Sequence, residues 1–405
     1  MLKKIIHRLL KHRHPWRDIS FNELSELYVA SLMRSASISM TGIFVPIYLY
    51  RLHYSITMVA VVFASYFTAR VFLDTVTAFT VARIGPKHTM VIGQFLQIAS
   101  SALFLTLPWA RWPLWFVGCI WGSSASFYFI PFHVDFSKIK HKVHGGKELG
   151  FEQIMEKIGL AIGPLMGGVI ATAVGERYIF LFSIVVLLAG LWPLFRTGEP
   201  VRVQQKLRYS DLTLDRVKGY ILPYIGLNIE NTLCLMLWPL FLAVVVLPGS
   251  SVYAKVGLLA SVSVVASIAT AYMAGRRIDN HQGRPLLRIS AVVNGLLHLC
   301  RPFVSIYPVA FGANVLNEVV TIGYRLPFTK GFYDATDDLP GYRIVFISSM
   351  ETIGCCAKAT AWWVLVMMST VLATKTFFIC GFTIASIASF LITTEKFKAL
   401  GAKGA

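Results

Sequence analysis

Residues 155–159 read Met-Glu-Lys-Ile-Gly, and a near copy, Met-Glu-Thr-Ile-Gly, returns 195 residues later at 350–354. Other short matches recur at almost the same offset and in the same order along the chain. They are Ile-Pro-Phe at 130–132 with Leu-Pro-Phe at 326–328, Pro46 with Pro239, and Gly85 with Gly283. Each match is weak alone, but several at one offset predict that the chain consists of two similar halves.

The composition predicts that both halves lie in a membrane. Of the 405 residues, 56% are hydrophobic and 14% are charged, whereas soluble domains are about 25% charged. A membrane-spanning helix needs about 20 mostly apolar residues, so we expect an all-α membrane protein with twelve transmembrane helices and two parallel six-helix repeats. The expected spans are 25–50, 55–82, 88–108, 112–133, 150–174, 177–196, 218–247, 252–276, 286–306, 307–329, 343–372 and 374–394.

The basic residues predict how the spans are oriented. Lys and Arg number 38 against 20 acidic residues, and they concentrate at both termini and in alternate loops, which is the positive-inside pattern rather than a nucleic-acid surface. Both termini are therefore expected in the cytoplasm. The expected segments are a basic, amphipathic N-terminal segment 1–24, a first bundle 25–196, a cytoplasmic linker 197–217, a second bundle 218–394 and a cytoplasmic tail 395–405.

Two parallel six-span halves, cytoplasmic ends and a basic middle loop resemble the major facilitator superfamily over nearly the whole chain. Parallel repeats accompany alternating access around a site at the middle of the membrane. The resemblance implies a monomeric secondary transporter of the cell (inner) membrane, neither an enzyme nor a cofactor protein, with a small-molecule or lipid substrate. It also implies that spans one, four, seven and ten line the cavity and that spans two, five, eight and eleven join the halves.

The superfamily's loop signature, G-x-x-x-D-R-x-G-x-R, occurs in a degenerate form in each half. The second half has Gly275, Asp279, Gly283 and Arg284, with one extra residue before Gly283. The first half keeps Arg83, Gly85 and Lys87, but Ala82 replaces the aspartate that latches the cytoplasmic side in the family. We expect a weakened latch in the first half; a tight basic turn that only sets topology is the alternative.

Span five carries a second signature, G-x-x-x-G-P-x-x-G-G, which is typical of antiporter branches of the superfamily that include many exporters. Its residues are Gly159, Gly163, Pro164, Gly167 and Gly168. Glycines four residues apart make a smooth helix face for close packing, and the proline lets the helix bend. This predicts a gating helix and favours efflux, although a simple packing seam is the alternative.

Ionisable residues inside predicted spans are candidates for coupling because they are costly in a bilayer. Glu230 in span seven has no local partner in the sequence, so we expect it to carry a proton or cation, with Arg34 as a counter-charge or a permanent partner. Arg70 and Asp74 lie four residues apart and predict an ion pair. Glu156 and Glu351 occupy equivalent positions and are expected to face each other or pair with Lys157 and Lys358. An arginine four residues before Gly122, common in proton-linked members, is replaced by Gly118.

The expected cavity is mostly aromatic or apolar, which suits a lipophilic or amphipathic solute. Besides Glu230, its predicted lining residues are Tyr28, Arg34, Tyr48, Phe127, Phe129, Trp238, Asn314 and Glu318. A lipid or glycolipid flippase on the same fold remains an alternative. So do a lipid-modifying transferase, for which His133 and Asp135 are the sole weak candidates, and a sensor that does not transport. No metal site is expected, and the histidines after span four give only a minor alternative.

Overall fold

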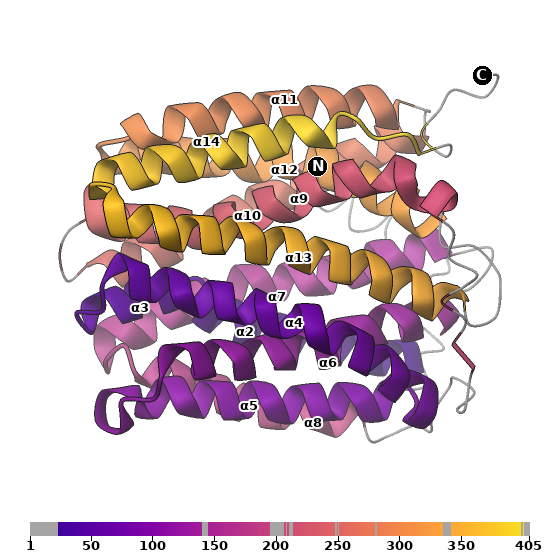
Figure 1. Ribbon diagram of the computed structural model, residues 1–405, viewed down its shortest axis with the longest axis horizontal. Coiled ribbons are helices and arrows are strands. Elements are labelled where there is room, and N and C mark those ends of the chain that lie inside the picture. The colour runs from indigo at the N-terminus through magenta and orange to yellow at the C-terminus, as the bar shows by residue number, and fades with distance from the viewer. Residues whose placement is uncertain are drawn as a thin grey trace, which may run out of the picture.

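A computed structural model describes residues 23–139, 145–194, 206–207, 209, 214–247, 249, 251–279, 282–334, 342–397 and 400. The predicted N-terminal amphipathic segment and most of the linker lie outside these residues. Figure 1 shows the helices side by side in two groups, α2–α8 in one and α9–α14 in the other. The arrangement is all-α throughout the described part of the chain.

Helices of the first group form six passages because α2 and α3 follow one another along one path. They are α2 (Glu23–Gly42), α3 (Val45–Arg51), α4 (Ile56–Ile84), α5 (Pro86–Ala110), α6 (Leu114–Ile139), α7 (Gly145–Ala173) and α8 (Tyr178–Leu194). The second group has α9 (Leu214–Phe241) with η3 (Leu242–Val246), α10 (Val252–Asp279), α11 (Gly283–Cys300) with η4 (Arg301–Phe303), α12 (Tyr307–Asp334), α13 (Tyr342–Val371) and α14 (Thr374–Ile392).

Each predicted span corresponds to one passage, and its ends agree within six residues. Breaks lie where the backbone chemistry requires them. Pro46 near the start of α3 has no amide hydrogen, so α2 cannot continue through it without losing a hydrogen bond. Gly85 turns the chain between α4 and α5 with a φ of 90°, a conformation that glycine adopts without steric cost.

Nine helical segments in the described residues are long and apolar enough to cross a membrane. The segment Tyr178–Trp192 is apolar but shorter, and α11 and α12 are not apolar enough to be counted with these nine segments. Those two helices carry buried polar residues, including Asn294, His298 and Asn317. The predicted ninth and tenth spans are therefore less apolar than the others because they contribute to a polar cluster inside the second half.

The two halves meet along two helix pairs, α4 with α13 and α7 with α10, and α3 also contacts α9. This agrees with spans two, five, eight and eleven joining the halves. Aromatic rings fill the α4–α13 seam, where the centroids of Phe63 and Trp362 lie 4.8 Å apart. At the end of the bundle that includes α3, the ring of Phe44 lies 5.3 Å from that of Tyr253.

Candidate functional site

Glu230, the predicted proton or cation carrier, lies inside the second half and is only 2% exposed. Its Oε1 accepts hydrogen bonds from Asn294 Nδ2 at 2.8 Å and from His298 Nε2 at 3.0 Å. Its Oε2 accepts from the Tyr324 hydroxyl at 2.6 Å. Three donors from α11 and α12 therefore stabilise a buried carboxylate.

A buried arginine lies behind His298. Arg301 is 0% exposed, and its Nη1 lies 3.3 Å from His298 Nδ1 and 3.2 Å from Cys234 Sγ. Its guanidinium is 4.6 Å from the centre of the Trp238 ring, a cation–π distance. Arg301 and Glu230 thus have opposite charges, with one imidazole between them.

Asn314 and Trp238, both predicted to line the cavity, are brought together at the edge of this cluster. Trp238 Nε1 donates to Asn314 Oδ1 at 3.0 Å, and Asn314 Nδ2 donates to Ser263 Oγ at 2.8 Å. Asn317 Nδ2 donates to Asn294 Oδ1 at 2.7 Å. Two hydrogen-bonded groups therefore lie side by side: one joins α9, α10 and α12 through Asn314, the other joins α9, α11 and α12 around Glu230, and the Arg301–Trp238 contact connects them.

Arg34 forms a separate cluster in the first half. Its Nη1 donates to Gln94 Oε1 at 2.9 Å, and its Nη2 donates to the Ser124 carbonyl at 3.3 Å. The guanidinium stacks on Tyr128, 3.8 Å from the ring centre, and lies 5.8 Å from the Phe129 ring centre. The expected pairing of Arg34 with Glu230 is not formed in this structure, because Arg34 contacts α5 and α6 of its own half and Glu230 contacts α11 and α12 of the other.

The predicted ion pair between Arg70 and Asp74 extends across the two halves. Arg70 Nε lies 3.8 Å from Asp74 Oδ1, and Arg70 Nη2 lies 2.9 Å from Glu351 Oε2. Tyr224 donates to Glu351 Oε1 at 2.7 Å, and Ser126 donates to Asp74 Oδ1 at 2.5 Å. Arg70 on α4 is therefore shared by a carboxylate of its own helix and one of α13.

Glu351 differs from its expected arrangement, because it contacts Arg70 and Tyr224. The Nζ atom of Lys358, its expected partner, lies 5.1 Å from the Phe67 ring centre. Glu318 pairs with Lys157 of the first half at 3.8 Å, a partner that the sequence did not predict for Lys157. Glu156 is half-buried on α7. Among the described residues, two ion pairs thus join the halves, Arg70–Glu351 and Lys157–Glu318.

A metal ion has one candidate position among the described residues. Ligand atoms of Asp74, Glu351 and Cys355 lie within 4.8 Å of one another. Arg70 already supplies a positive charge to both carboxylates, which opposes binding of a further cation. His133 and Asp135 belong to α6, whereas His141 and His144 lie outside the described residues.

Glycines of the span-five signature pack in two directions. A side chain at Gly159 or Gly167 would lie within 2.7 Å of backbone atoms of Leu32 or Met40, on α2 of the same half. Gly163 faces α2 in the same way. Gly168 instead approaches Tyr253 of α10, and a side chain at Gly257 would strike the Pro164 carbonyl. The smooth face therefore packs on α2, while the seam between halves uses Pro164, Gly168 and Gly257.

Loop-signature residues occupy the α4–α5 and α10–α11 turns. Arg83 is exposed, Lys87 is buried and Gly85 makes the turn itself. Gly275 lies in open space within α10, and α10 ends at Asp279. Gly283 is buried. Arg284 Nε contacts Glu395 Oε1 at 2.8 Å, and its Nη2 donates to the Phe397 carbonyl at 2.7 Å.

Glu395 and Phe397, which Arg284 contacts, follow α14 and are each 1% exposed. Arg284 therefore fixes the segment after α14 against the second half. Residues 395–397 of the predicted tail thus pack into the second half. The arginine of the second loop signature contacts its own half here, not the first half.

Tyr48 was predicted to line the cavity, but it lies elsewhere. It is 1% exposed, its hydroxyl donates to the Phe104 carbonyl at 3.1 Å, and its ring lies 4.9 Å from that of Phe180. These partners all belong to the first half, so Tyr48 is part of that half's packed core. Tyr28, Phe127 and Phe129 are half-buried.

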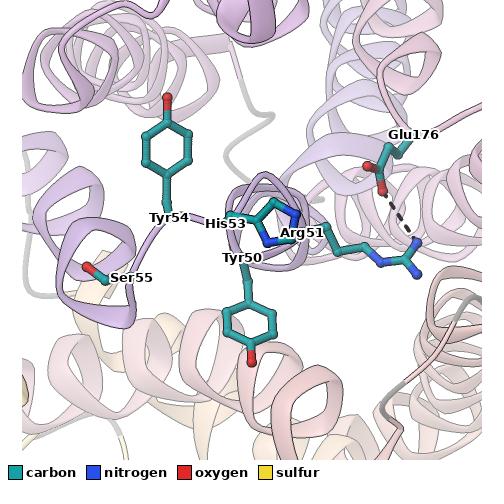
Figure 2. Close-up of a pocket in the computed structure, with 6 residues that line it drawn as sticks. All are labelled: Tyr50, Arg51, His53, Tyr54, Ser55 and Glu176. Atoms are coloured by element: carbon teal, nitrogen blue, oxygen red, sulfur yellow. Dashed lines mark ion pairs between the residues drawn. The ribbon is translucent and has the colours of Figure 1, made fainter.

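The end of the bundle predicted to be non-cytoplasmic has a pocket of about 730 Å³. Its lining residues are Tyr50, Arg51, His53, Tyr54, Ser55 and Glu176. Figure 2 shows Arg51 directed at Glu176, with Tyr50 and Tyr54 pointing in opposite directions. Arg51 Nη1 lies 3.6 Å from Glu176 Oε2, and Arg51 Nη2 donates to the Gly249 carbonyl at 3.1 Å. Arg51 therefore connects the halves at this end.

Comparison with known proteins decides the family. The Major Facilitator Superfamily profile matches residues 27–323, well over half of the chain. The chain belongs to the major facilitator superfamily. No curated protein matches the sequence.

Similar solved structures of superfamily transporters support the same fold. A D-xylose–proton symporter is 14% identical with a TM-score of 0.68, covering 94% of this chain and 99% of that chain. A POT family transporter in complex with 5-aminolevulinic acid is 13% identical with a TM-score of 0.70, covering 91% and 95%. The nucleoside transporter NupG is 12% identical with a TM-score of 0.69, covering 93% and 100%. The chain is thus a multi-pass membrane protein with a secondary-transporter fold.

Proposed function

We propose that this superfamily member is a proton-coupled secondary transporter that exports a lipophilic or amphipathic solute across the cell membrane by alternating access. Proton coupling is inferred from the environment of Glu230, whose carboxylate is 2% exposed and has a hydrogen-bond donor at each oxygen. A group that must change charge inside a membrane is the usual element of proton coupling. Arg34 cannot take this role, since a guanidinium keeps its proton.

The seam between the halves supports an apolar or aromatic substrate. Phe63, Tyr66, Trp121 and Trp362 lie together there, with Phe63 contacting both tryptophan rings. Lys358 is buried beside the Phe67 ring, which adds a positive charge to an aromatic surface. A solute with an apolar body and a polar end fits this chemistry better than a sugar, whose hydroxyl groups need many polar partners.

The proposed direction of transport and the proposed orientation of the chain in the membrane are based on the sequence. The full span-five signature, typical of antiporter branches, supports export, and the basic residues in alternate loops support cytoplasmic termini. A single copy of the chain contains both halves needed for alternating access, which supports a monomer.

The test uses the purified chain in lipid vesicles that contain a pH-sensitive dye. Amphipathic drugs, lysolipids, sugars and amino acids are added with and without a pH gradient, for the wild type, Glu230→Gln and Tyr307→Phe. We expect proton movement driven by amphipathic solutes in the wild type and in Tyr307→Phe, and none in Glu230→Gln. Solute movement without proton movement in the wild type would refute proton coupling, and sugar-driven movement would refute the solute class.

A further inference from the structure

The two oxygens of Glu230 have different surroundings. Oε1 accepts from two fixed donors, Asn294 Nδ2 and His298 Nε2. Among the described residues, Oε2 has a single donor, the Tyr324 hydroxyl. A carboxylate oxygen accepts about two hydrogen bonds through its lone pairs. Oε1 is therefore fully used, whereas Oε2 keeps room for an added proton.

Arg301 determines which ring nitrogen of His298 carries the hydrogen. A guanidinium can only donate, and Arg301 Nη1 lies 3.3 Å from His298 Nδ1. Nδ1 is therefore the acceptor, so the hydrogen is on Nε2 and points at Glu230 Oε1, 3.0 Å away. Asn294 Nδ2 lies 3.2 Å from Nε2 because it donates to the same Oε1. A second proton on His298 would face the Arg301 guanidinium. The imidazole is thus held neutral and directs its donor at Glu230.

The Tyr324 hydroxyl has one hydrogen but two acceptors within reach. Glu230 Oε2 lies at 2.6 Å and Thr321 Oγ1 at 3.3 Å. While Glu230 is charged, the shorter bond holds the hydrogen. Once Oε2 binds a proton, Glu230 becomes the donor, and the tyrosine oxygen can accept only if its own hydrogen turns to Thr321.

We propose that Glu230 takes up its proton at Oε2, with the Tyr324 hydroxyl turning from Glu230 to Thr321, while His298, held by Arg301, keeps Oε1 as an acceptor. One O–H bond forms on Oε2 as one O–H bond of a hydronium ion breaks and a water molecule is released, and no proton leaves His298, Arg301 or Tyr324. Tyr324, Thr321 and His298 are positioning residues for this step. The proposal rests on the proposed function for its biological role, but its chemistry can be tested without a substrate.

Other titratable groups around Glu230 lie behind these partners or on other faces of α9. Cys234 of α9 contacts Arg301 and Asn317. Charged Glu351 of α13 is held on the Tyr224 side of α9, and Tyr224 is six residues from Glu230, about 120° away around the helix. Among the α14 residues Phe377–Ile392, Cys380 is the sole titratable side chain. The hydrogen bonds of Glu230 therefore come from His298, Asn294 and Tyr324 among the described residues.

Opposite effects of two substitutions distinguish this arrangement from a merely structural network. Tyr324→Phe removes a donor that serves the charged carboxylate, so the protonation midpoint should rise by about one to two pH units. Thr321→Val removes the acceptor used only when Glu230 is protonated, so the midpoint should fall by about half a unit to one unit. His298→Leu should raise the midpoint, and His298→Gln, which can donate and accept at once, should restore most of it.

The measurement is a pH titration of the full chain in lipid vesicles by infrared difference spectroscopy, following the carboxylic C=O band that is lost in Glu230→Gln. Tyr307→Phe and Thr383→Val are matched controls. Their hydroxyls donate to the Lys255 and Ile379 carbonyls, so both substitutions should leave the midpoint unchanged. Shifts of opposite sign for Tyr324→Phe and Thr321→Val support the proposal. Shifts of the same sign, no shift in either, or no band assigned to Glu230 overturn it.

The vesicle transport assay separates the two proposals. A titrating Glu230 band with opposite shifts, in a protein that moves solute without protons, supports the Oε2 site and refutes the coupled function. Proton-coupled transport with no opposite shifts supports the function and refutes the Oε2 site. Nitrogen-15 spectra of the His298 ring, assigned with His298→Gln, must also show the neutral Nε2–H form; a hydrogen on Nδ1 refutes the proposed clamp.

Discussion

Removing Arg70 should destabilise the protein far more than removing Glu351, although the two side chains form one ion pair. In Arg70→Gln, Asp74 at 0% side-chain exposure and Glu351 at 16% lose the guanidinium that they share. Breaking a buried pair from one side costs about 3–5 kcal/mol. In Glu351→Gln, Arg70 keeps Asp74 at 3.8 Å, and the amide oxygen still accepts a hydrogen bond, so we expect a loss of about 1–2 kcal/mol.

Reversible unfolding in mixed micelles measures both free energies, and the double variant gives the coupling between the residues. With both changes present, only Asp74 remains as a buried anion, so the double variant should lose less than the sum of the single losses, by about 0.5–3 kcal/mol. Equal losses in the two single variants, or strict additivity, would refute the view that Arg70 serves one carboxylate from each half.

Three further substitutions probe the contacts within and between the halves. Gly257→Ala should disfavour this conformation about 5- to 150-fold, because its new methyl group strikes the Pro164 carbonyl, and overpacking costs about 1–3 kcal/mol. Spin-label distances between the α3–α4 and α9–α10 turns would show this shift, whereas Gly312→Ala, which points into open space, should show none. Arg34→Lys should lose about 1–2 kcal/mol of unfolding free energy, because lysine cannot both stack on Tyr128 and bond two acceptors; an unchanged unfolding midpoint would contradict that role. Arg51→Gln should shift the balance between conformations, read from the same spin-label distances, by less than about 1 kcal/mol, because the ion pair of Arg51 is about one-third exposed. Any shift should become smaller in high salt.

The sequence was sufficient to predict the helices, and the resemblance to the superfamily predicted which of them join the halves. Long apolar runs and positive-inside charges determine where the spans lie, and the repeat of 155–159 at 350–354 determines how the halves correspond. Those patterns depend on composition along the chain, which the bilayer constrains strongly. The shared-face ion pair of Arg70 and Asp74 was also predictable, because four residues on a helix are one turn apart.

Helix rotation was not predictable, and most differences at the site follow from it. Tyr48 turns into the core of its own half, and Arg34 turns toward α5 and α6 rather than toward Glu230. His298 and Arg301 were not predicted as site residues, although both are ionisable and lie within the predicted span 286–306. Because ionisable residues inside a span are costly and usually functional, the same rule that selected Glu230 would also have selected these two residues.

The two polar clusters occupy equivalent places in the repeat but differ in chemistry. Arg34 and Glu230 are 196 residues apart, and so are Tyr128 and Tyr324. In the first half the tyrosine ring lies under a guanidinium, whereas in the second half the tyrosine hydroxyl bonds a carboxylate. A guanidinium cannot release its proton under ordinary conditions, but a carboxylate can. The same position of the repeat therefore holds a fixed charge in the first half and a group able to titrate in the second, and this difference is why the proposed proton coupling is assigned to Glu230.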